Sequence, residues 1–263
     1  MTDLMLEKLP GLTFGERLAG RVASALTGNL AIRLDNAPIC SFTFDDCPRS
    51  ALENAGALLE SLGASATFFV SGRPAIEQKD LSDPYMWGDD LPKALSKGHE
   101  IGCHTYTHPH LGRLSAGEIH AEIDANLAAI RRLLPNAELV SFAYPFGEVS
   151  ITAKQIVARR FGVARGVRRG LNGRLVDLSE LRTCSIDGSY FGKEKMRRII
   201  KNAVRRRSWL VFSAHTVGLA PAEWGCSLEQ FEFVVREVRS AGIEILPLRS
   251  ALGRITHRAP RDQ

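Results

Sequence analysis

Five residues of this sequence could carry out metal-dependent acid–base chemistry. Asp45 and Asp46 are adjacent acids, His104 and His108 are four positions apart, and His215 stands alone; the acid pair and His215 each follow an apolar run. Two imidazoles and one carboxylate are a ligand set for a divalent ion that leaves positions open for water and substrate. The remaining acid and the third histidine could then move protons.

Each of these residues also has an ordinary structural interpretation. Imidazoles four apart lie on one face of a helical turn, so His104 and His108 can converge on one ion, but this spacing is common by chance. The adjacent acids could form an Asx turn or cap a helix before Pro48, and His215 could be a core histidine. Neighbouring strand residues point to opposite faces, so two functional acids require the chain to turn at Asp45.

Short runs of β-branched or aromatic residues alternate with amphipathic segments along most of the chain. The periodicity predicts seven strands, at residues 39–44, 66–70, 139–143, 163–167, 182–186, 210–212 and 243–247. It predicts helices at residues 49–62, 115–134, 151–161, 190–206 and 227–241, the second opened by a capping box of Ser115 and Glu118. Ile101 and Cys103, before the histidine pair, are interpreted as a short apolar turn.

This alternation predicts a single α/β domain with a parallel sheet and helices outside it, either a barrel or an open sheet. In both arrangements the site lies at the carboxyl ends of the strands. Residues 1–36 are interpreted as an N-terminal helical extension, because their apolar residues repeat every four positions, residues 37–253 as the main domain, and residues 254–263 as a basic tail.

Four motifs, in this order, resemble those of the polysaccharide deacetylase family, the NodB-homology proteins of carbohydrate esterase family 4. They are Thr43-Phe44-Asp45-Asp46, His104-Thr-Tyr-Thr-His108 after Gly98-His-Glu-Ile-Gly102, Phe142-Ala-Tyr-Pro-Phe-Gly147, and the surroundings of His215. The resemblance spans roughly residues 38–250 and implies a distorted (β/α)7 barrel. It also implies that Asp45 is the catalytic base, that Asp46, His104 and His108 hold the metal, and that His215 is the catalytic acid.

The sequence departs from the family pattern at four positions, which are Cys47, Ala143, Ser213 and Thr216. Ala143 stands where the third motif has an arginine, and Arg165, Arg168 or Arg182 could reach in from a neighbouring strand end. Ser213 stands where a hydrophobic residue normally lines the pocket for the acyl methyl group. An acetyl substrate is therefore expected, while other acyl groups stay open.

Further residues are assigned around this centre. The third motif is expected to contact the substrate through Tyr144, Pro145 and Phe146, with a backbone N–H near Phe146 stabilising the oxyanion. Three more candidate substrate contacts are Ser213, Trp87 and Arg165. Trp87 belongs to residues 73–91, a stretch of weak periodicity that could be a lid or a satellite cluster.

One divalent metal ion is expected as the cofactor, zinc first, with cobalt, nickel or manganese as alternatives. Cys47 and Cys103 each adjoin a proposed ligand and could supply thiolates, but small buried cysteines are common. His99 and His110 are interpreted as packing residues or as groups that support the ligands.

These features predict hydrolysis of an N-acyl group, N-acetyl first, on a sugar, an oligosaccharide or a lipid-linked glycan. The same metal–water chemistry would serve a formamide, a cyclic amide or an O-acetyl ester. A third interpretation, from another class of protein, is a glycan-binding module with a decayed active site. The substitutions at Ala143, Ser213 and Thr216 would suit it.

Composition and charge narrow the partners. With 44% hydrophobic and 24% charged residues, the 263-residue chain is typical of globular proteins, and its net charge of +5 is mild, so no nucleic acid is expected. The basic run at 193–207 is interpreted as a solvated helix face or as a contact for an anionic surface. With no membrane-spanning stretch, no recognisable signal peptide and five cysteines outside any CxxC pair, a cytoplasmic location is expected.

Overall fold

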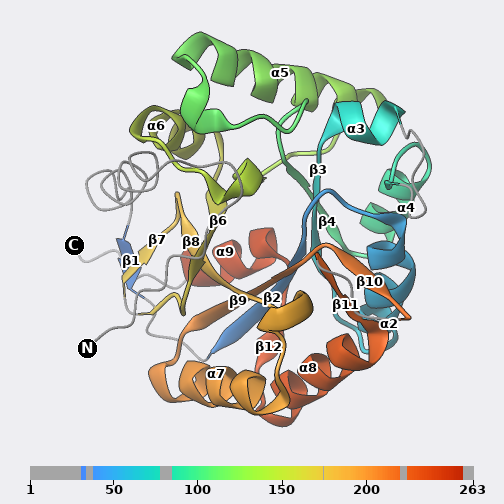
Figure 1. The fold of residues 1–263 in the computed structure, drawn as a ribbon, viewed down its shortest axis with the longest axis vertical. Coiled ribbons are helices and arrows are strands. Elements are labelled where there is room, and N and C mark those ends of the chain that lie inside the picture. The colour runs from blue at the N-terminus through green and yellow to red at the C-terminus, as the bar shows by residue number, and fades with distance from the viewer. Residues whose placement is uncertain (1–30, 34–37, 78–84, 174, 220–223, 257–263) are drawn as a thin grey trace.

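Seven parallel strands form a closed ring at the centre of the computed structural model, which describes residues 31–33, 38–77, 85–173, 175–219 and 224–256 (Figure 1). In order around the ring they are β2 (Ile39–Phe44), β3 (Thr67–Val70), β4 (Glu100–Cys103), β5 (Ser141–Ala143), β6 (Val163–Arg169), β8 (Leu181–Ser185) and β9 (Trp209–Ala214). The first strand, β2, pairs with the last, β9, along its full length, and this pairing closes the barrel. The distorted (β/α)7 barrel is therefore confirmed.

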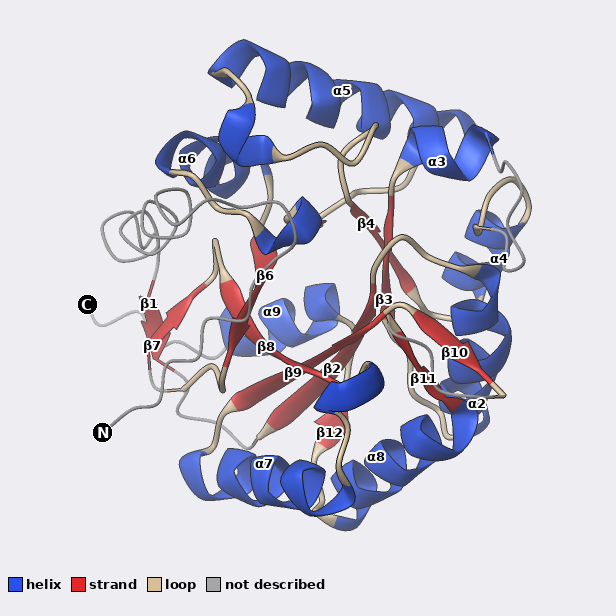
Figure 2. Cartoon of the chain, viewed as in Figure 1, coloured by secondary structure: helices blue, strands red, loops and turns tan. Residues whose placement is uncertain are grey.

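Helices surround the ring (Figure 2). In chain order they are a π-helical segment (Ala51–Gly56) that continues into α2 (Ala57–Ser61), α3 (Gly72–Glu77), α4 (Asp90–Ser96), α5 (Ala116–Leu133), α6 (Ile151–Arg160), α7 (Lys193–Arg206), α8 (Leu228–Ser240) and α9 (Leu248–Thr256). Two small sheets lie outside the ring, β1 (Ala31–Arg33) with β7 (Leu175–Asp177) and β10 (Thr216–Gly218) with β11 (Gly225–Ser227). Among the described residues, no helix is both long enough and apolar enough to cross a bilayer.

A short eighth strand distorts the ring. The strand β12 (Glu244–Ile245) pairs with Ile39 and Cys40 at the start of β2, whereas β3 pairs with Thr43 and Phe44 at its end. Because β9 occupies the other edge of β2, both partners share one edge, and β12 lies between β2 and β3 at the amino-terminal end of the barrel.

Alternating side chains along the strands build two hydrophobic cores. Phe42 and Phe44 point outward and pack against the Phe231 ring of α8. Side chains on the other face of the strands, such as Trp209 and Phe69, form a second cluster, which also includes buried residues of α9. The backbone N–H groups at the start of α9 donate to the side chains of Thr67 and Glu100, the first residues of β3 and β4. This helix therefore closes the amino-terminal end and leaves the carboxyl end for a site.

Within the ring, the sequence prediction was wrong at one strand, and outside it α3, α4, α9 and the short strands β7, β10 and β11 were not predicted. Six predicted strands lie in the ring and the seventh is β12, but residues 100–103, interpreted as a turn, form β4. Gly102 weakens the strand pattern there, yet only glycine fits, because a Cβ at this position would lie 2.5 Å from the Phe69 ring. The predicted helix at 49–62 begins as a π-helix. The predicted helix of the N-terminal extension and most of the basic tail lie outside the described residues.

Candidate active site

The two adjacent acids lie in a tight turn directly after β2. The backbone N–H of Asp45 still donates to Ala214 of β9, at 3.0 Å, so Asp45 ends the strand ladder. Asp46 and Cys47 then adopt left-handed backbone conformations, with φ of 55° and 50°. This turn, expected from the sequence, lets both carboxylates serve the same end of the barrel.

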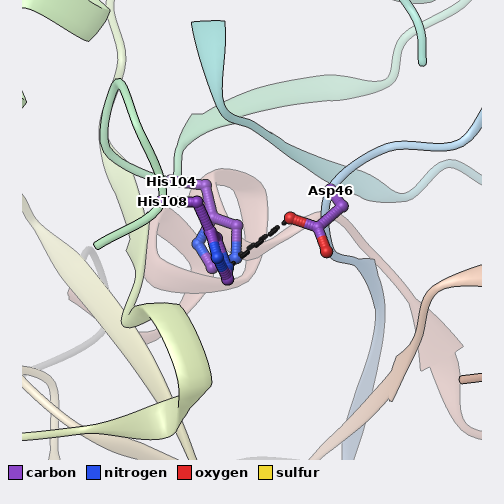
Figure 3. A group of neighbouring side chains, drawn as sticks. All are labelled: Asp46, His104 and His108. Atoms are coloured by element: carbon purple, nitrogen blue, oxygen red, sulfur yellow. Dashed lines mark ion pairs between the residues drawn. The ribbon is translucent and has the colours of Figure 1, made fainter. Parts of the chain in front are cut away.

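Asp46, His104 and His108 form a group that fits a metal ion (Figure 3). The Oδ1 atom of Asp46 lies 3.6 Å from Nε2 of His108 and 3.9 Å from Nε2 of His104. One potential ligand atom from each residue lies within 4.8 Å of the others. Two imidazole nitrogens and one carboxylate oxygen are the donor set that zinc and neighbouring transition metals take, so the residues present fit such an ion.

The histidine pair converges without a helical turn, which corrects the sequence interpretation. His104 directly follows β4, and the loop to His108 passes through left-handed conformations at Thr105 and His108, with φ of 66° and 56°. His104 Nδ1 lies 2.8 Å from the carbonyl oxygen of Ala143, an arrangement that places the proton on Nδ1 and leaves Nε2 as a ligand. Burial lowers the pKa of His104 to about 4, which keeps the imidazole neutral.

Asp45 pairs with Arg165, a buried arginine from another strand. Ala143 of β5, the position that lacks the family arginine, is directly opposite Arg165 of β6 in the strand register. The Arg165 guanidinium is fully buried and donates to Oδ1 of Asp45. Burial would raise the pKa of the Asp45 carboxyl, but the charge and hydrogen bond of Arg165, helped by the charge of His215, outweigh it and hold the pKa below its usual value.

This placement changes the interpretation of Arg165. The sequence predicts Arg165 both as a substrate contact and as a possible substitute for the missing arginine. With no exposed surface and its guanidinium on Asp45, it cannot contact a substrate in this arrangement. Its position matches the role of a substitute, because the Arg165 guanidinium, one strand away from Ala143, reaches the Asp45 carboxylate.

Sequence reasoning missed Asp187, which holds His215. Nδ1 of His215 lies 3.1 Å from Oδ2 of Asp187, while Nε2 faces Asp45 at 4.0 Å from Oδ2. Burial alone would lower the pKa of His215, but the hydrogen bond and charge of Asp187, helped by Asp45, raise it to about 9. Its place in the sequence could have identified it. Asp187 directly follows the predicted strand at 182–186, and the carboxyl ends of the strands are where the site is expected.

The residues of the third motif lie partly in the core and partly at the rim of the site. The Tyr144 side chain is buried, and its hydroxyl donates to the carbonyl of Ser179, so only its backbone is near the site. Pro145 is also buried, whereas Phe146 is 37% exposed and has φ of 55°. Its ring stacks on His110, with centroids 4.0 Å apart, and meets His108 edge-on at 4.5 Å. Phe146 thus lies beside the metal-capable group.

The other substrate candidates lie at different depths. Ser213 of β9 is nearly buried and is opposite Thr43 in the register, one level below Asp45. Trp87 packs partly buried against the main core, and its backbone N–H donates to the carboxylate of Asp90.

The cysteines and the remaining histidine near the motifs have structural contacts. The Cys47 thiol donates to the carbonyl of Phe69, and Cys103 accepts from Asn126; burial raises the pKa of both thiols, to about 11 for Cys103. His99 bridges Glu60 and a backbone N–H. Neither cysteine belongs to the metal-capable group found among the described residues.

Comparison with known proteins agrees with this geometry. Residues 35–164, just under half of the chain, match the family described as polysaccharide deacetylase. It is 33% identical to chitin deacetylase 1 of Saccharomyces cerevisiae over 135 residues, covering 50% of this chain and 40% of the relative. It is 32% identical to a chitooligosaccharide deacetylase of Bradyrhizobium over 106 residues, covering 40% of this chain and 44% of the relative. These matches span less than half the length of either relative.

Solved structures share the fold at low sequence identity. A family 4 acetyl xylan esterase from Clostridium thermocellum, in complex with a cobalt ion, superposes with a TM-score of 0.59 at 20% identity, over 83% of this chain and 92% of that one. A CE4 family pseudoenzyme from Bacillus anthracis gives a TM-score of 0.60 at 17% identity, over 82% of this chain and 66% of that one. At this identity the likeness shows the barrel alone.

Proposed function

We propose that this chain is a metal-dependent hydrolase that removes an N-acyl group, N-acetyl first, from an amino sugar in an oligosaccharide or glycoconjugate. The observation that carries the proposal is one constellation at the open end of the barrel. The metal-capable group of Asp46, His104 and His108 lies beside two charged pairs, Asp45 with Arg165 and His215 with Asp187. The match of residues 35–164 to the polysaccharide deacetylase family supports the same chemistry.

In this proposal three residues hold one divalent ion, and zinc suits their donor set best, with cobalt, nickel and manganese as alternatives. A bound divalent ion lowers the pKa of a water molecule and polarises the carbonyl of the scissile amide. The hydrogen bond from His104 to the Ala143 carbonyl fixes which imidazole nitrogen faces that ion.

Asp45 and His215 divide the proton transfers. The Arg165 charge keeps Asp45 ionised at neutral pH, so this carboxylate can accept a proton from the attacking water. The Asp187 carboxylate keeps His215 protonated, so its Nε2, which faces the site, can donate to the leaving amine. In this proposal a backbone N–H near Phe146, whose ring lies beside His108, stabilises the oxyanion.

A second candidate activity is hydrolysis of an O-acetyl ester. Ser213 replaces the hydrophobic residue expected beneath the site, and one structural neighbour is an acetyl xylan esterase. The glycan-binding interpretation drew on the loss of the arginine at Ala143, and a pseudoenzyme shares the fold. Arg165 weakens that interpretation, because it supplies the missing charge.

The test is a panel assay on purified protein with one equivalent of Zn²⁺. We expect amine release from N-acetylated chitooligosaccharides and a smaller release of acetate from acetylated xylan. Asp45→Asn should retain the metal and lose nearly all turnover, whereas Asp46→Asn should lose the metal as well. Metal binding without turnover on any amide or ester would favour the glycan-binding interpretation and overturn the proposal.

A further inference from the structure

The loop that carries the two histidines has an irregular backbone. Two of its non-glycine residues, Thr105 and His108, lie in the left-handed region, which ordinary side chains avoid. The loop is neither helix nor strand, so its backbone groups lack the regular partners of those elements. An irregular loop that must hold two imidazoles in one geometry needs support from outside.

Glu122 of α5 supplies that support. One of its carboxylate oxygens, Oε2, accepts hydrogen bonds from the backbone N–H groups of Tyr106 and Thr107, at 3.0 and 2.8 Å. The other, Oε1, accepts from the Thr107 hydroxyl at 2.8 Å. All three donors lie between the histidines, and hydrogen bonds to an ionised acceptor are stronger than neutral ones.

A second polar residue on the same helix face anchors the surroundings of the loop. Asn126, one turn after Glu122 and fully buried, accepts from the backbone N–H of Gly72 and donates to the carbonyl of Val70. The segment that it holds bonds in turn to the loop, because Arg73 donates its backbone N–H to the carbonyl of Tyr106. Residues four apart on a helix lie on one face, so α5 presents both supports together.

We propose that Glu122 is a positioning residue of the metal centre, which sets the spacing of His104 and His108 by fixing the two peptides between them. The inference rests on the metal centre of the proposed function. Glu122 does not belong to the metal-capable group, and its effect is transmitted through the loop backbone. Outer groups that orient metal ligands affect metal affinity by about 10–100-fold.

The test measures the dissociation constant of Zn²⁺ for the metal-free full chain, by competition with a chromophoric chelator. In Glu122→Ala we expect a loss of affinity on the order of 10-fold or more. Glu122→Gln should recover most of it, because the amide oxygen can accept both backbone N–H groups and the amide N–H can donate to Thr107. Asp124→Asn, which removes a charge from the same helix at an exposed pair with Arg160, is the matched control and should bind like wild type.

The melting temperature of each metal-free variant separates positioning from general stability. If Glu122→Ala does not fold, Glu122→Asp keeps the charge but shortens the reach, and it should show an intermediate loss of affinity. Equal Zn²⁺ affinity in wild type and a folded Glu122 variant that lacks these bonds would overturn the inference while leaving the metal centre intact. Failure of wild type to bind Zn²⁺ would overturn the metal centre as well.

Discussion

At the scale of single residues, opposite charges alternate across the site. Arg165 lies against one oxygen of Asp45, His215 faces the other, and Asp187 holds the far side of the His215 ring. Each buried charge thereby has a partner, which burial demands. The same arrangement keeps Asp45 deprotonated and His215 protonated over a shared pH range.

The pH dependence of activity should report the His215–Asp187 pair. The pKa of His215 is raised to about 9, so its acid form is present at neutral pH and activity should fall as pH rises toward that value. Asp187→Asn removes the main group that raises this pKa, so the basic limb of kcat/KM should move to lower pH. His215→Ala should lose on the order of 10²-fold on an amide and much less on an activated ester, whose leaving group needs no proton.

A basic limb that stays in place in Asp187→Asn would show that another group controls it. Equal losses of the His215→Ala variant on the two substrates would mean that His215 positions the substrate instead of donating a proton.

The residue types of the site were visible in the sequence, but their contacts were not. Asp45, Asp46, His104 and His108 stand out by type and spacing, and the structure brings them together. Asp187 was missed because one acid after a strand carries no pattern of its own. The choice between Arg165 and two other arginines depended on strand register, which spacing along a sequence does not encode.

At the scale of elements, the guanidinium near Asp45 comes from β6 instead of β5. Arg165 of β6 pairs with Ala143 of β5, the position at which the family has its arginine. Arg165→Met should raise the pKa of Asp45, because the charge that lowers it is removed, and should move the acidic limb of kcat/KM to higher pH. The double variant Ala143→Arg with Arg165→Ala places the guanidinium on the neighbouring strand and should move the limb back toward wild type. The measurement is the pH profile of kcat/KM on one amide substrate.

Arg168→Met, on the same strand but paired with Glu180, is the control and should leave the acidic limb in place. A double variant whose limb remains where Arg165→Met puts it would show that the two strand positions are not equivalent.

Elements with a strong hydrophobic periodicity were predicted well, and irregular elements were not. The capping box of Ser115 and Glu118 opens α5 as expected. The strand β4 was missed because Gly102 is dictated by the Phe69 ring of the neighbouring strand, a long-range contact. The helical turn expected between His104 and His108 failed because hydrogen bonds from α5, and not local periodicity, set that loop.

At the scale of the whole molecule, metal binding should stabilise the barrel. The proposed ligands follow the ends of two strands that lie far apart in the sequence, so the unfolded chain has no preformed site. Zn²⁺ at about 100 times its dissociation constant should add about 2.7 kcal/mol, or roughly 5–10 °C in melting temperature. A chelator should reverse the shift, as measured by thermal unfolding.

His108→Ala should lose this Zn²⁺-dependent shift while still folding, because two remaining ligands bind weakly. His120→Ala, which removes an imidazole from the exposed side of α5, should keep it. A full shift in His108→Ala would place the ion elsewhere.

The closing pair of the ring has a consequence for synthesis on the ribosome. Ile39 pairs with Trp209, so 170 residues separate the first strand from the neighbour that completes it, and β12 comes later still. At a translation rate of ~5–20 residues per second, this edge of β2 stays unpaired for roughly 10–35 s. The nascent chain thus has an unpaired, apolar strand edge during that time, and such an edge can pair with the strands of other chains. We expect the yield of native protein to depend on factors that shield this edge during translation.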